Sequence, residues 1–253
     1  MKIKKSNFID WNYKILITSL KKIDLNILLI VILDALFYFL SGYLFIFWLQ
    51  RIQAKMAAFN LPQDVASIGY ERLQQIVNEA KLFYYLLIFS FILLLIAIIF
   101  LSSVLKGIIW TKTTNTKITF ALISRFLGLN LIWMGFWFVL VISISLLVEP
   151  SLTPAFMIAT IILGLYFTNA LYAIFMKKPM LRTIIASVKL SVAKIHLFLL
   201  PYSIILLLFF ILVRISAFLK FGYASFLVGL ILLFYAAIVR YYISTLVLEI
   251  GKV

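Results

Sequence analysis

One acidic residue, Asp34, stands inside a long apolar run, where an ionisable side chain could do chemistry. It lies nine positions into a run that begins at Leu25. At 1.5 Å per residue, this places it about 13 Å from the start of the run, close to the middle of a bilayer about 30 Å thick. An ionised carboxylate at that depth costs at least about 2.5–3.5 kcal/mol, so we expect Asp34 to face protein or water and to have a partner.

Arg240 is the partner that matching of depths indicates. If the last apolar run continues to about Leu248, Arg240 lies about 12 Å from the end of that run. We therefore predict an intramembrane polar pair, Asp34 and Arg240, that joins the first run to the last. Two alternatives stay open. The last run could end at Val239 and leave Arg240 in an interfacial belt, and Asp34 could be protonated or take part in proton or ion coupling.

Other chemistries lack the residues that they need. The sequence has no cysteine, which excludes disulfides and thiolate metal sites. Its only histidine, His196, cannot form a zinc site alone. The motifs of zinc metalloproteases, serine hydrolases and phosphate-binding loops are absent. We predict a protein that is not an enzyme, with no catalytic residues, no metal and no cofactor.

Composition and apolar runs predict the elements that position these residues. Hydrophobic residues make up 66% of the 253 residues and charged residues 12%, against roughly 45–50% and about 25% in soluble domains. We predict an all-α fold, a polytopic transmembrane helix bundle that forms a single integral membrane domain, residues 1–253. The six runs long enough to cross a bilayer as helices are residues 25–49, 82–105, 127–148, 152–176, 197–219 and 221–248.

The distribution of basic residues predicts the orientation. Of the 23 Lys and Arg residues, 16 lie before the first run, after the second, after the fourth or at the C-terminus, whereas five lie between the other runs. The larger group includes Lys106, which directly follows the second run. Because cytoplasmic loops are enriched in Lys and Arg, we predict a plasma-membrane protein with both termini in the cytoplasm. An organellar inner membrane is the alternative.

Two segments have the pattern of amphipathic helices on a membrane surface. Residues 9–23 and 181–195 each carry apolar residues three or four positions apart, with lysines off that face. The net charge of +15 therefore indicates anionic lipid headgroups as partners and no nucleic acid, because the basic residues flank apolar runs. The predicted headgroup contacts are Lys21, Lys22, Arg182, Lys189 and Lys194.

A polar stretch, residues 51–81, is predicted on the outer side. Asn60, Leu61 and Pro62 interrupt it, and the helical spacing that follows should lead straight into the second membrane span. With an extension of the first span, it would form a helical hairpin above the membrane that could dock a protein partner. The alternative is a helix that lies flat on the lipid headgroups.

The layout of interfacial helices and membrane hairpins resembles that of prokaryotic membrane families such as the membrane domain that accompanies some glycerophosphodiester phosphodiesterases. The resemblance covers most of the chain, rests on layout and transfers no functional residue. We predict a multi-pass membrane protein that acts as a non-enzymatic accessory or scaffold subunit or as a lipid-interacting module. The alternative is a small transporter or channel subunit that uses Asp34 and Arg240 near the bilayer midplane.

Overall fold

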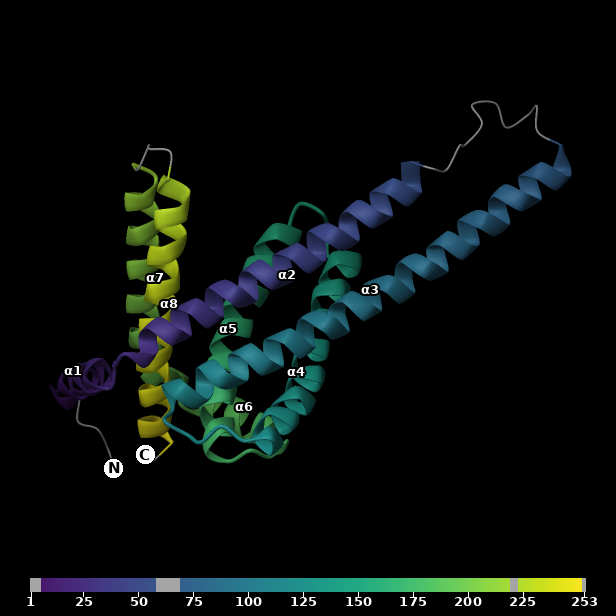
Figure 1. Cartoon of the computed structure of the whole chain (residues 1–253). Coiled ribbons are helices and arrows are strands. Elements are labelled where there is room, and N and C mark those ends of the chain that lie inside the picture. The colour runs from purple at the N-terminus through teal and green to yellow at the C-terminus, as the bar shows by residue number, and fades with distance from the viewer. Residues whose placement is uncertain (1–5, 58–68, 219–222, 252–253) are drawn as a thin grey trace. The chain divides into compact units, whose positions relative to one another are not determined.

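The described part of the chain is all-α in a computed structural model (Figure 1). The structure describes residues 6–57, 69–218 and 223–251, and these contain helices and no strand. The helices in chain order are α1 (Ser6–Lys21), α2 (Asn26–Ala57), α3 (Tyr70–Thr113), α4 (Phe120–Leu147), α5 (Thr153–Lys177), α6 (Thr183–Ala193), α7 (Ile195–Ser216) and α8 (Ala224–Ile250).

Six of these helices, α2, α3, α4, α5, α7 and α8, are long and apolar enough to cross a membrane. Each corresponds to one predicted span, which confirms the all-α transmembrane bundle as the fold class. Three helices extend well beyond the predicted apolar runs. Helix α2 continues to Ala57 and α3 begins at Tyr70, both within the polar stretch 51–81 where helical continuations were expected. In addition, α3 runs on to Thr113 and α4 begins at Phe120. Hydrophobicity marks only the part of a helix in hydrocarbon, whereas backbone hydrogen bonds continue through the polar turns beyond it.

The chain divides into two compact units. Unit 2 consists of Leu36–Ser102, and unit 1 consists of Met1–Ala35 and Ser103–Val253. In unit 2, α2 and α3 lie side by side. The Trp48 indole Nε1 donates to Ser90 Oγ at 3.1 Å and the Trp48 ring packs on Phe91, which fastens the two helices together. The single membrane domain, residues 1–253, stays a prediction.

The core of unit 1 is built around α5, which packs on α4, α6 and α8. Rings fill the space between α4 and the C-terminal half of α5, where Phe126 packs on both Tyr172 and Phe175. From α7, the Phe198 ring packs on Tyr166 of α5. Neighbouring α7 and α8 pack along each other (Figure 1). Aromatic contact therefore replaces much of the aliphatic packing in this core.

The short helix α1 has the exposed apolar face that the sequence predicts, whereas on α6 the predicted apolar residues Ile184 and Val188 pack against the core. On α1, the side chains of Ile9, Tyr13, Leu16 and Leu20 are all exposed. The buried face is different and more polar: Asn12, Ile15 and Ser19 lie toward the protein on α1, which packs on α8. On α6, which packs on α5, the buried residues are Thr183, Ser187 and Ser191.

Candidate functional site: a buried ion cluster

Asp34 lies in unit 1 on the first turns of α2. It stands eight residues after Asn26, which corresponds to about 12 Å along the helix axis. Its side chain is 1% exposed, and both carboxylate oxygens accept charged hydrogen bonds. Each oxygen of this buried carboxylate therefore already accepts a hydrogen bond from a cation, the strongest kind of hydrogen bond that a side chain can offer it.

Arg240, the predicted partner, reaches Asp34 from α8. Its Nη1 donates to Asp34 Oδ2 at 2.8 Å, and its side chain is 11% exposed. The helix α8 continues through Arg240 to Ile250, so Arg240 lies within the helix and not in a segment that follows it. Arg240 lies about 15 Å from that helix end at 1.5 Å per residue, a depth similar to that of Asp34 in α2. The structure thus brings together the two residues that the sequence pairs.

Lys106 is the third member of the cluster, and the sequence did not identify it. Its Nζ donates to Asp34 Oδ1 at 2.6 Å, and its side chain is 15% exposed. Hydropathy places Lys106 just outside the second run, among the flanking basic residues. In the structure α3 continues past it to Thr113. The apolar residues 107–110, which follow Lys106, are the signal that could have placed it inside the membrane.

The ion cluster, Asp34 with Lys106 and Arg240, has apolar neighbours on the same helices, most of them three or four positions away. Side chains three or four positions apart share a helix face. At an effective dielectric constant near 20, two opposite unit charges 4 Å apart attract each other by about 4 kcal/mol. Burying each ion costs several kcal/mol, so the attraction and the desolvation cost are of similar size. The cluster carries a formal charge of +1 and joins α2, α3 and α8. The apolar cluster there consists of Ile30, Val31, Ile109, Ala237 and Tyr241.

A second buried polar contact joins α3, α4 and α5. Asn130 on α4 is fully buried, and its Nδ2 donates to Ser103 Oγ at 2.9 Å. Its Oδ1 accepts from the Tyr172 hydroxyl at 2.6 Å. Both ends of the amide are therefore used. Such bonds between membrane helices typically contribute about 0.6–2 kcal/mol, so this contact is best understood as helix packing.

The five predicted headgroup residues lie at one end of unit 1, which we name the basic end: α2 begins there, and α3, α5 and α8 end there. Lys21, Arg182 and Lys189 are exposed, and Lys194 is half-buried. Lys22 differs, because its Nζ is directed to Thr245 Oγ1 on α8 at 3.2 Å. Their contact with lipid headgroups stays a prediction.

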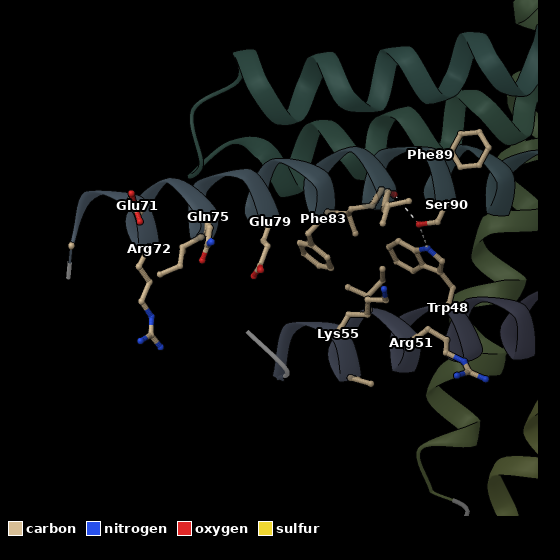
Figure 2. Close-up of a pocket in the computed structure, with 16 residues that line it drawn as sticks. Trp48, Arg51, Lys55, Glu71, Arg72, Gln75, Glu79, Phe83, Phe89 and Ser90 are labelled. Atoms are coloured by element: carbon tan, nitrogen blue, oxygen red, sulfur yellow. Dashed lines mark hydrogen bonds between the residues drawn. The ribbon is translucent and has the colours of Figure 1, made fainter. Parts of the chain in front are cut away.

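A cleft of about 1320 Å³ opens within unit 2 between α2 and α3 (Figure 2). Trp48 and Ser90 close it at one end, and Figure 2 shows Glu79 and Phe83 directed from α3 toward α2. Ile52 of α2 and Ile76 of α3 also line it, with Arg51 and Lys55 on α2 and Glu71 and Arg72 on α3. The cleft therefore combines an apolar floor with a charged rim of both signs.

No protein-family model, curated protein or solved structure matches this chain. Within the described ranges, no group of three His, Asp or Glu side chains is placed to hold a metal ion. The chemistry of the ion cluster and of the cleft must therefore carry any statement about function.

Proposed function

We propose that this multi-pass membrane protein is a non-enzymatic accessory or scaffold subunit that receives a helix of a partner protein in the cleft of unit 2. The cleft is the observation that carries this proposal. At 1.5 Å per residue, the 44 residues of α3 extend about 66 Å, twice the roughly 30 Å of a hydrocarbon core. A large part of α3, with the charged residues near its start, therefore lies outside the membrane.

The chemistry of the cleft fits an amphipathic helix. Its floor carries Ile52, Ile76 and Phe83, which would contact an apolar stripe, as in other complexes in which a helix occupies a hydrophobic groove. The charged residues of its rim would pair with acidic and basic residues on either side of that stripe. Leu73, which lies three positions before Ile76 and shares its face of α3, is an exposed apolar side chain in this segment, which is typical of an interaction surface.

The ion cluster supports a structural role rather than transport. Proton or ion coupling through Asp34 requires its carboxylate to reach water and to change partners. Its 1% exposure and its two cationic donors, Lys106 and Arg240, favour a fixed contact instead. That contact ties the parts of α2 and α3 that belong to unit 1 to α8.

Orientation and lipid contact belong to the same proposal. Both termini lie in the cytoplasm of a plasma-membrane protein, with the basic end against anionic headgroups. The turn near Pro150 then lies outside. A reporter enzyme that is active only in the cytoplasm should show no activity when it is fused at Pro150. Activity of that fusion would overturn this orientation.

Photocrosslinking in native membranes tests the docking site. A crosslinking amino acid at Ile76, which lines the cleft, should capture one protein, whereas the same group at the adjacent exposed Val77 should not. Replacing Ile76 by Glu should abolish copurification of that protein in lipid nanodiscs, and Val77→Glu is the matched control. Equal capture at both positions, or a homogeneous particle without a partner, would contradict the proposal. Ion or solute flux in liposomes that Asp34→Asn abolishes would favour the transporter alternative.

A further inference from the structure

A polar cavity of about 490 Å³ lies at the basic end of unit 1, separate from the ion cluster and from the cleft. Six segments line it: the link between α1 and α2, the start of α2, the end of α3, the turn that follows, the end of α5, and α8. Each segment except α8 contributes a basic or amide side chain, and the lysines are Lys22, Lys112 and Lys177. Lysines from three separate parts of the chain therefore line one partly open cavity.

Neutral groups hold two of these lysines in place. Lys22 Nζ contacts the Thr245 hydroxyl at 3.2 Å, and Lys177 Nζ donates to the backbone oxygen of Thr114 at 3.3 Å. An ammonium group has three donors, so a lysine can bind an anion while it keeps a contact of this kind. The three ammonium groups bring positive charge and hydrogen-bond donors to the cavity.

Asp24 is the one carboxylate in the lining, and the start of α2 engages it. Its Oδ1 accepts from the backbone N–H of Asn26 at 3.0 Å, and its Oδ2 accepts from the Asn26 side-chain amide at 2.6 Å. The Tyr241 hydroxyl lies 3.4 Å from Oδ1. With three lysines and this one carboxylate, the lining has a formal charge of +2.

The position of the cavity matches that of lipid headgroups. Lys22 follows α1, whose apolar face is exposed as on a helix that lies at a membrane surface. Lys112 and Lys177 stand at the ends of two spans, α3 and α5. Small-molecule pockets have volumes of roughly 300–1,000 Å³, so this cavity can hold a phosphorylated headgroup and not only an ion. Its walls are mainly Thr, Asn and Lys side chains, which suit a polar headgroup better than an acyl chain.

We propose that this cavity binds the phosphoryl headgroup of one anionic lipid through Lys22, Lys112 and Lys177. The proposal turns a diffuse attraction between the basic end and the membrane into a defined site. It does not depend on a partner at the cleft, so either proposal can fail alone. Basic pockets between transmembrane helices are known to hold anionic headgroups by this chemistry.

Native mass spectrometry of the full chain tests the site. Wild-type protein purified from nanodiscs of mixed phosphatidylglycerol and phosphatidylcholine should retain one phosphatidylglycerol after excess lipid is removed. Changing Lys22, Lys112 and Lys177 together to Gln should weaken retention on the order of 100-fold, because each lysine near an anionic headgroup contributes about a fivefold effect. A control with Lys14, Lys117 and Lys178 changed to Gln removes the same charge from exposed positions outside the cavity and should retain the lipid.

Three further comparisons test the site. An equal loss of bound phosphatidylglycerol in the two triple variants would overturn the proposal, because it would show a general attraction between the basic surface and the lipid. Binding of glycerol 3-phosphate as tight as that of phosphatidylglycerol, and lost in the cavity variant only, would keep the phosphoryl site and assign it to a soluble ester. Retention of neither ligand would overturn it. If the triple variant does not fold, Asn115→Asp places a negative charge on the exposed turn residue of the lining, and unchanged retention there would also overturn it.

Discussion

Replacing Asp34 by Asn should destabilise the protein by about 3–5 kcal/mol, the cost of removing one partner from a buried ion pair. The side chain is 1% exposed and accepts from Lys106 at 2.6 Å and from Arg240 at 2.8 Å. Asn keeps the shape of the side chain but leaves two cations in an apolar environment. The remaining cluster has a formal charge of +2 instead of +1, so repulsion adds to the lost attraction.

Changes to the cations should cost less, and this order is specific to the geometry. With Lys106→Gln, Asp34 and Arg240 still form a neutral pair, and the loss is close to that of one charged hydrogen bond, about 1.5–3 kcal/mol. The free energy of unfolding can be measured by circular dichroism during titration of detergent micelles with a denaturing detergent. Asp24→Asn is the control, because that carboxylate is exposed and its removal should cost less than about 1 kcal/mol.

A double-mutant cycle supplies the result that would refute this reasoning. The losses of stability from Asp34→Asn and Arg240→Gln should sum to more than the loss in the double variant, with a coupling of about 0.5–3 kcal/mol. Simple additivity would mean that the two side chains do not interact. A larger loss from Lys106→Gln than from Asp34→Asn would mean that Asp34 is not the centre of the cluster.

Two further predictions concern packing between membrane helices. Gly107→Ala should lower the unfolding free energy by no more than about 1 kcal/mol, because the new Cβ would lie 2.9 Å from Ile123 Cδ1, the end of a side chain that can shift, and the gain in helix propensity offsets part of the cost. Gly128→Ala, with nothing within 4 Å of the new Cβ, should leave it unchanged or raise it by up to about 1 kcal/mol, and equal effects would contradict the packing. Asn130→Ala should cost about 1–3 kcal/mol because the buried Tyr172 hydroxyl loses its acceptor, and unchanged thermal stability in detergent would count against that contact.

The spans were predictable from sequence because the membrane imposes a simple requirement. A helix that crosses hydrocarbon needs about 20 apolar residues, so the number and type of the spans follow from the apolar runs. The ends of α3 followed only in part. The helical spacing in the polar stretch 51–81 indicated that this helix begins before residue 82, whereas its continuation from residue 106 to Thr113 was not predicted. Residues 106–113 mix lysines and threonines with a short apolar stretch, which a hydropathy pattern does not join to the run that ends at Leu105.

The ion cluster was predictable only in part, for a related reason. Asp34 and Arg240 could be paired because both stand inside apolar runs at matching depths. Lys106 follows Leu105 at the edge of a run, and its charge counts equally well as a positive-inside residue. Its true position depends on how far α3 continues and on which face meets α2. Both are set by tertiary packing that a linear pattern does not contain.

Buried polar residues in this chain mark where helices meet. The predicted apolar face of α1 is exposed, while Asn12 and Ser19 on the opposite face are buried; on α6, Ser187 and Ser191 are buried in the same way. In lipid, an apolar side chain gains little by moving from hydrocarbon to protein, whereas small polar groups allow close approach and find partners between helices. The same physics places Asp34 between two cations at the junction of α2, α3 and α8. In such a chain, the apolar residues indicate which segments enter the membrane, and the few polar ones indicate which faces of those segments touch.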